Sequence, residues 1–195
     1  MLSSEALMAA YQCGDVDAFA ALVTRHEKPL WNFLRRLVGD AATAEDLLQE
    51  TFVRVVQHAP SYTPSARFST WLYTIARNLC VDQARKRVHR RALSLDAAPG
   101  DRDSDAPGPL EAALAGPAIG GEQAALDREL GARLDHAIAA LPAPQREVFV
   151  MREVLELPFA EIALAVGASE ATVKSRMRYA LERLRETLAE EPGPC

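Results

Sequence analysis

The chain has 195 residues, of which 49% are hydrophobic and 25% are charged. This length suits one domain or two small ones of about 100 residues each, and the composition excludes a wholly disordered chain. The net charge of −5, from 22 Lys and Arg against 27 Asp and Glu, argues as a single number against a polyanionic partner such as DNA.

Signals for targeting, disulfides and metals are weak. No segment approaches the roughly 18 unbroken apolar residues of a membrane span. The opening MLSSEALMAA lacks the basic start and longer apolar run of a signal peptide, so a cytoplasmic protein without membrane insertion is expected. Neither a disulfide framework nor a zinc site is predicted, because no CxxC or CxxH pair occurs among Cys13, Cys80 and Cys195. No metal site is expected from the scattered histidines, which are His26, His58, His89 and His136.

The segment 93–121 is predicted to be a flexible linker. It holds four of the 12 prolines and five of the 10 glycines, and it has no aromatic residue. The sequences on either side have apolar residues at spacings of three and four, without alternating β-branched runs. We therefore predict an all-α fold with two small helical domains, residues 1–92 and 122–190, followed by a short tail at 191–195.

In the first domain, Ser3 or Ser4 is predicted to cap a short helix that stops at Gly14, and Asp15 or Asp17 to cap the next helix. Proline at position 29 is expected to kink or interrupt that second helix.

Two further helices are predicted in the first domain. Thr43 followed by Asp46 resembles a capping box and opens a helix to about His58, whose apolar face consists of Leu47, Leu48, Phe52, Val55 and Val56. A long helix then runs from Ser65 or Phe68 to the arginines near position 90. Its inner stripe consists of Phe68, Trp71, Leu72, Ile75 and Leu79.

The second domain has the outline of a helix-turn-helix. A helix over 122–140 repeats an aliphatic residue every four positions, at Leu126, Leu130, Leu134 and Ile138. Pro142 or Pro144 opens the next helix, to about Leu155. A short helix over 159–166, a turn at 167–169 and a longer helix over 170–188 follow.

Three residues have the spacing of a helix-turn-helix. Ala163 is small where the two helices touch, Gly167 permits the left-handed turn, and Val173 is tucked between the helices. The second helix is predicted to present small, hydroxylic and basic groups to a major groove, namely Ala171, Thr172, Lys174, Ser175, Arg178 and Tyr179. A helical hairpin that packs against another protein remains the alternative.

The charge is unevenly distributed. Residues 67–92 contain seven basic residues and one acid, interleaved with aromatic and amide side chains, whereas residues 93–130 contain eight acids and two arginines. Cations that neutralise phosphates beside flat rings that stack on bases suit a nucleic-acid partner. A solvated helix face is the alternative for the basic block.

Three runs of the sequence resemble the bacterial RNA polymerase sigma factors, specifically the small extracytoplasmic-function (ECF) group. In chain order these runs are AEDLLQETFVRVV, ARFSTWLYTIARNLCVDQARKR and ALPAPQREVFVMREVLELPFAEIALAVGASEATVKSRMRYALERLRETL. The resemblance implies a non-catalytic specificity subunit without a cofactor, which works with RNA polymerase in the cytoplasm at the nucleoid. It also implies three partners: core polymerase (through the β′ clamp coiled coil and the β subunit), promoter DNA and an anti-sigma factor.

The resemblance also implies site residues. Contacts with the β′ clamp coiled coil are expected from Asp46, Gln49 and Glu50. The minus-ten element is expected to be read by Phe68, Ser69, Thr70, Arg77, Asn78 and Arg85. The minus-thirty-five element is expected to contact Arg152, Ala171, Thr172, Lys174, Ser175, Arg176, Arg178 and Tyr179.

Other functions remain open at this point. The linker resembles the tether that threads through the polymerase, where RNA displaces an acidic strand, but it also suits a featureless spacer. A helix-turn-helix regulator that never joins the polymerase is the main alternative function. A helical module whose basic face binds an acidic protein is the second.

Overall fold

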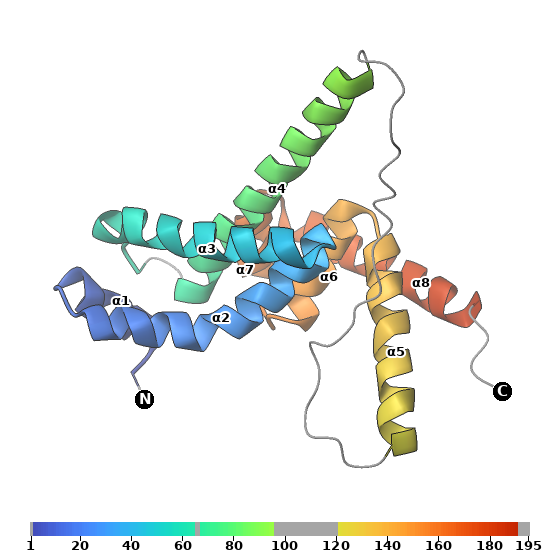
Figure 1. The fold of residues 1–195 in the computed structure, drawn as a ribbon, viewed down its shortest axis with the longest axis horizontal. Coiled ribbons are helices and arrows are strands. Elements are labelled where there is room, and N and C mark those ends of the chain that lie inside the picture. The colour runs from blue at the N-terminus through green and yellow to red at the C-terminus, as the bar shows by residue number, and fades with distance from the viewer. Residues whose placement is uncertain (1, 65–66, 96–120, 191–195) are drawn as a thin grey trace.

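The computed structural model describes residues 2–64, 67–95 and 121–190 (Figure 1). Every regular element in these segments is helical, which confirms the predicted fold class. The elements are α1 (Ser4–Gln12), α2 (Val16–Val38), α3 (Ala41–His58), the 3-10 turn η1 (Ala59–Ser61), α4 (Phe68–Leu95), α5 (Gly121–Ala140), α6 (Ala143–Glu153), α7 (Phe159–Val166) and α8 (Glu170–Glu190). Most of the predicted linker and the tail lie outside the described residues.

Side-chain caps begin the first helices. The Ser3 hydroxyl accepts a hydrogen bond from the N–H of Ala6 at 3.1 Å, and Asp15 accepts one from Ala18 at 3.1 Å. These caps agree with the predicted starts of the two helices.

The predicted capping box at Thr43 is wrong. The cap of α3 is Asp40, which accepts a hydrogen bond from the N–H of Thr43 at 2.7 Å. Gly39 follows the last residue of α2 and has φ of +80°, so the chain turns there and α3 begins two residues later, at Ala41.

Of the two effects expected of Pro29, a kink or an interruption of the helix, the interruption does not occur. The helix runs through it from Val16 to Val38, and Leu30, Phe33 and Leu34 in the following turn are fully buried. A proline removes one backbone hydrogen bond from a helix. Burial of these three apolar side chains offsets that loss and stabilises the helix beyond Pro29.

The N-terminal half, α1 to α4, packs around the stripe predicted for α4. Phe68 and Leu72 are fully buried, and Trp71, Ile75 and Leu79 are partly buried against the same core. On α3 the prediction fails for Val56, which is 41% exposed. Each residue turns the helix by about 100°, so the position after the buried Val55 rotates toward solvent.

The C-terminal half consists of α5 to α8. Ile138 is buried, but Leu130 and Leu134, which were predicted to share its apolar face, are 50% and 41% exposed. Side chains that are four residues apart differ by about 40° in direction around the helix axis. Leu130 and Leu134 therefore turn progressively away from the core that Ile138 faces. The side chain of Leu126 lies outside the described residues.

The two halves pack against each other (Figure 1). Helix α7 lies on α4, while α5 and α6 lie on α2. Buried apolar residues form one cluster that runs through both halves. In the segments that the structure describes, no helix has the length and apolar character needed to cross a membrane.

Candidate nucleic-acid interface

A left-handed turn sets the angle between α7 and α8. Gly167 has φ of +65°, and the N–H of Ala168 donates to the carbonyl of Ala163 at 3.1 Å. Ser169 then accepts a hydrogen bond from the N–H of Thr172 at 3.1 Å. Val173 is fully buried. The predicted helix-turn-helix is therefore present, with the glycine and the buried valine in the expected places.

One face of α8 projects into solvent. The exposed residues there are Ala171, Thr172, Lys174, Ser175, Arg178 and Tyr179, whereas Arg176 is half-buried. Lys174 pairs with Glu170 at 2.6 Å, and Arg178 lies 3.8 Å from Glu182. Exposed pairs of this kind contribute less than about 1 kcal/mol, so a phosphate can replace either carboxylate.

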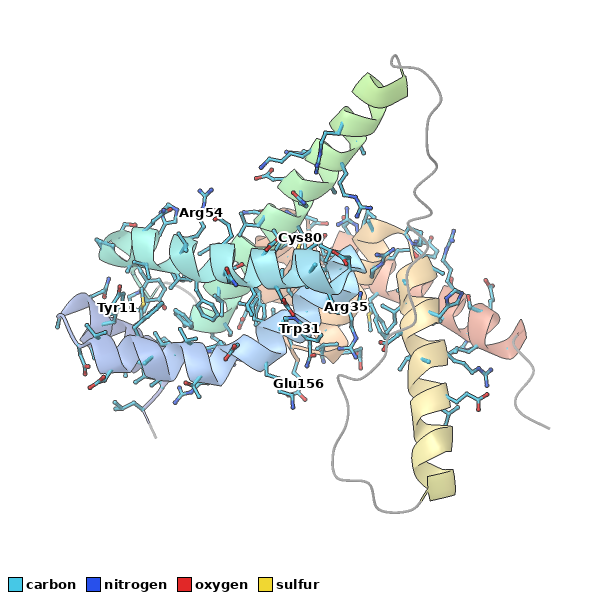
Figure 2. The ribbon with its side chains drawn as sticks, in the orientation of Figure 1. Tyr11, Trp31, Arg35, Arg54, Cys80 and Glu156 are labelled. Carbon is cyan, nitrogen blue, oxygen red and sulfur yellow. The ribbon has the colours of Figure 1, made fainter. Side chains whose placement is uncertain are left out.

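Arg152, which was predicted to contact DNA, makes contacts within the protein. The guanidinium donates to the carbonyl of Leu157 at 3.0 Å and lies 5.1 Å from the ring centroid of Phe159. It thereby supports the loop ahead of α7. Glu156, labelled in Figure 2, belongs to this loop, and its φ is +53°.

On α4 the predicted minus-ten residues differ in accessibility. Asn78 and Arg85 are exposed, and Ser69 is half-buried. Phe68 is fully buried and lies 5.2 Å from the ring of His26. Its aromatic face is therefore occupied by core contacts.

Trp71 belongs to the same aromatic group. Its ring lies 5.8 Å from Phe68 and 4.8 Å from Tyr62, and its side chain is half-buried. The structure thus uses Trp71 in the packing of the N-terminal half.

Two acids from the C-terminal half contact this part of α4. Glu147 on α6 is ion-paired with Arg77, with a second hydrogen bond of 3.4 Å from Arg77 Nη2 to Glu147 Oε2. Glu161 on α7 accepts a hydrogen bond from the hydroxyl of Thr70 and lies 3.4 Å from Arg67. Sequence reasoning missed both acids, because no local pattern connects positions 70 or 91 residues apart.

The start of α4 is held by α1. Glu5 Oε1 accepts a hydrogen bond from the N–H of Phe68 at 2.8 Å. This hydrogen bond is the main cause that lowers the pKa of the Glu5 carboxyl.

The predicted polymerase-binding face lies on α3. Asp46 and Gln49 are exposed, while Glu50 is half-buried and pairs with Arg54 at 2.7 Å. Arg54 points outward from α3 (Figure 2). Leu47 is buried beneath this face and holds α3 on its own half of the molecule.

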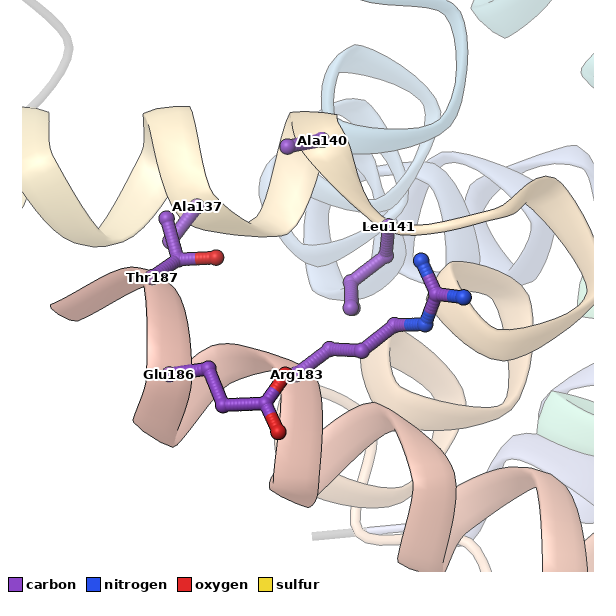
Figure 3. A pocket seen from close by; sticks show the side chains of 6 residues that line it. All are labelled: Ala137, Ala140, Leu141, Arg183, Glu186 and Thr187. Atoms are coloured by element: carbon purple, nitrogen blue, oxygen red, sulfur yellow. The ribbon is translucent and has the colours of Figure 1, made fainter. Parts of the chain in front are cut away.

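A cavity of about 330 Å³ lies between the end of α5 and α8 (Figure 3). The residues that line it are Ala137, Ala140, Leu141, Arg183, Glu186 and Thr187. None of the predicted site residues belongs to it. Within 2–64, 67–95 and 121–190, no cluster of three or more His, Cys, Asp or Glu residues is arranged to hold a metal.

Two free cysteines are described. Cys13 is exposed, and Cys80 is buried in α4. Burial raises the pKa of the Cys80 thiol to about 12, so this thiol stays protonated at neutral pH.

Two family models match segments of the chain. The family description Sigma-70 region 2 matches residues 22–90, and Sigma-70, region 4 matches residues 131–184. The first match contains α3 and most of α4, and the second contains the helix-turn-helix.

Two curated relatives align with most of the chain. The ECF RNA polymerase sigma factor SigL of Mycobacterium tuberculosis is 37% identical over 171 residues, which cover 87% of this chain and 88% of that protein. The ECF RNA polymerase sigma factor SigW of Bacillus subtilis is 31% identical over 175 residues, covering 90% and 91%. The fold is similar to that of sigma factor RpoE, crystallised with the anti-sigma factor NepR from Bartonella quintana. That similarity has a TM-score of 0.66 at 24% identity and covers 89% of this chain and 98% of that one. The chain belongs to the extracytoplasmic-function group of RNA polymerase sigma factors.

Proposed function

We propose that the protein directs core RNA polymerase to promoters with two DNA-binding surfaces, α4 for the minus-ten element and α8 for the minus-thirty-five element. The observation that carries this proposal is the exposed face of α8, with Lys174, Ser175, Arg178 and Tyr179 on the second helix of a helix-turn-helix. Hydroxyl and basic side chains on such a helix reach base edges and phosphates in the major groove.

Helix α4 is proposed to hold the melted minus-ten strand. Opening DNA costs about 1.4 kcal/mol per stacked step, so a protein that stabilises the open state must offer contacts to bases that leave the stack. Asn78 supplies an exposed amide for a base edge, and Arg85 an exposed cation for a phosphate. Arg77 is also proposed to bind a phosphate, after its ion pair with Glu147 has been broken.

The exposed part of α3 is proposed to dock on the β′ clamp coiled coil. Asp46 and Gln49 present polar groups there, and Glu50 adds a second carboxylate at the edge. Acidic groups that face a basic partner increase the rate of encounter and set the register of docking more than they raise affinity.

Two properties follow from this role. The protein acts as a regulatory subunit without catalysis of its own and works where the polymerase is, in the cytoplasm at the nucleoid. An anti-sigma factor is proposed as its regulator, because the RpoE protein of similar fold was crystallised with one.

The test is reconstitution with core polymerase. Core enzyme alone and core enzyme with this protein are compared in run-off transcription on DNA selected from a random pool by the reconstituted holoenzyme. We expect promoter-dependent transcripts only when the protein is present. Specific binding of DNA by the protein alone, without any affinity for core polymerase, would instead identify a regulator that does not join the enzyme.

A further inference from the structure

We propose that α1 positions the start of α4, where Ser69 and Thr70 are expected to read the minus-ten element. Two side chains of α1, Glu5 and Gln12, fasten the two ends of the connection between α3 and α4, and they are called the α1 clamp below. The inference rests on the proposed function of α4. It assigns Glu5 and Gln12 as positioning residues, which act through the start of that helix and not on DNA directly.

Gln12 holds the beginning of the connection. Its Nε2 donates to the carbonyl of Ala59 at 2.8 Å and to the carbonyl of Tyr62 at 2.9 Å. Ala59 is the first residue of η1, and Tyr62 directly follows its last residue. One side-chain amide therefore bridges the two ends of η1 from a helix 47 residues earlier in the chain.

Glu5 holds the end of the connection. Its Oε1 accepts the hydrogen bond of 2.8 Å from the N–H of Phe68, with which α4 begins. The ring of Phe68 is fully buried, and its centroid lies 6.0 Å from that of Tyr62. Since Gln12 holds the carbonyl of Tyr62, both parts of the α1 clamp act on one aromatic contact. A displacement of Tyr62 is therefore transmitted to the first turn of α4.

The two side chains of the α1 clamp project from the same face of α1. Positions seven residues apart differ by only about 20° in direction around a helix axis and by about 10 Å along it. Met8 lies between them and is fully buried. Helix α1 thus presents one polar group to each end of the connection, on either side of a buried anchor.

Helix α1 is itself fastened to α2 (Figure 1). Ser4 Oγ lies 2.9 Å from His26 Nε2 and accepts a hydrogen bond from Arg25 at 3.2 Å. Near the other end of α1, the ring centroid of Tyr11 lies 4.7 Å from that of Phe19. The α1 clamp therefore acts from a support that is fixed at both of its ends.

The described part of the connection, residues 59–64, is stiff. It contains Pro60 and Pro64, and the ring of a proline fixes φ near −65°. Tyr62 is buried, and its ring centroid lies 4.8 Å from that of Trp71. Groups that recognise a ligand have to be held within about 0.5 Å of their productive geometry. Loss of one attachment of so stiff a segment is therefore expected to reduce discrimination among bases.

The first experiment compares variants of the full chain in the reconstituted holoenzyme. Gln12→Glu keeps the size of the side chain but removes both donors, and Glu5→Ala removes the acceptor. Competition between the selected non-template strand and single-base-substituted strands measures discrimination at the minus-ten element. Discrimination is expected to fall about fivefold in each variant, as for the loss of one hydrogen bond, while affinity for core polymerase stays at the wild-type value.

Two further variants are matched controls. Ala9→Glu adds the same negative charge as Gln12→Glu at an exposed position of α1, and it should discriminate as the wild type does. Glu5→Gln keeps an oxygen that accepts from the N–H of Phe68, so its discrimination should be restored relative to Glu5→Ala. A purely structural role of Glu5 or Gln12 would instead lower core affinity and discrimination together.

The second experiment measures the position of the connection directly. Trp71 is half-buried against Tyr62, and Trp31→Phe leaves it as the single tryptophan of the chain. In this background, Gln12→Glu is expected to increase acrylamide quenching of Trp71 and to shift its emission to the red, because Tyr62 covers the indole ring less well. Ala9→Glu should keep the quenching of the parent protein.

The outcomes separate this inference from the proposed function. Increased quenching of Trp71, lower discrimination and intact core affinity in Gln12→Glu support the α1 clamp. Unchanged quenching overturns it, whether or not the protein directs transcription, and so does an equal loss of core affinity and discrimination. A wild-type holoenzyme that does not discriminate among minus-ten sequences overturns the proposed function of α4, and quenching alone then decides whether the α1 clamp exists.

Discussion

The carboxylate of Glu5 on α1 accepts a hydrogen bond of 2.8 Å from the backbone N–H of Phe68, the first residue of α4. The first N–H groups of a helix have no partner within the helix, so this side chain caps α4 from 63 residues away. Glu5 thereby helps to position the helix that carries the residues proposed to read the minus-ten element.

Replacing Glu5 by Ala is expected to lower the free energy of unfolding by about 1 kcal/mol at neutral pH, because a cap of this kind is lost. The pKa of Glu5 is lowered in the folded protein, chiefly by the hydrogen bond from Phe68. Its contribution is therefore complete above the pKa of the unfolded chain and disappears as the pH falls through the lower folded pKa. Urea unfolding of both proteins over a series of pH values checks this.

Glu5→Gln serves as the control. Its amide oxygen still accepts the hydrogen bond but does not titrate, so its stability relative to Glu5→Ala should not vary with pH. A difference between the wild type and Glu5→Ala that persists at acidic pH would contradict the assigned cause.

Replacing Asn78 by Ala is expected to weaken discrimination among minus-ten sequences while affinity for core polymerase stays unchanged. The side chain is exposed on α4 and accepts a 3.3 Å hydrogen bond from the adjacent Arg77, so its removal should leave the fold intact. Competition between selected and single-base-substituted non-template strands measures this effect in the holoenzyme. Gln49→Ala, on the face proposed to bind the polymerase, should show the reverse pattern. Equal losses of both activities in Asn78→Ala would assign Asn78 to the fold.

Replacing Lys174 and Arg178 by Ala together is expected to lower affinity for the minus-thirty-five duplex and to reduce its salt dependence. Each lost phosphate contact reduces the slope of log affinity against log salt by about one. Fluorescence anisotropy at several salt concentrations measures the slope. Arg183→Ala removes a cation from the side of α8 that lines the cavity with α5 (Figure 3), so it should leave the slope unchanged, and an unchanged slope in the double variant would exclude phosphate contact there.

Replacing Gly167 by Ala is expected to destabilise the C-terminal half by about 1 kcal/mol, because a side chain disfavours the left-handed backbone. Gly167 has φ of +65°, and apart from its chain neighbours no atom of the described residues lies within 4 Å of a Cβ placed there, so the cost is conformational. Gly131→Ala, within α5 and equally uncrowded, should stabilise the protein by about 0.5–1 kcal/mol. Thermal unfolding of both variants tests these opposite effects on stability. Changes of Tm of the same sign and size in the two variants would contradict the backbone cause.

Local features were predictable because their causes lie within a few residues. Ser3 and Asp15 cap the helices that follow them, and Gly167 makes the turn of the helix-turn-helix. The aliphatic residues that recur every four positions in α5 predicted a single buried face, but Leu130 and Leu134 face solvent. Amphipathic periodicity identifies a helix more reliably than it identifies the residues that become buried.

The sequence by itself determined that this protein is helical, that it contains a helix-turn-helix, and that its basic residues gather on α4 despite a net charge of −5. Periodicity, capping and turn chemistry act over one or two turns of chain, so a linear reading detects them. Only the tertiary structure decided that Glu5 caps α4 and that Glu147 and Glu161 cover Arg77 and Thr70. Those contacts depend on how separate helices pack, and packing brings together residues whose separation in the chain carries no local signal.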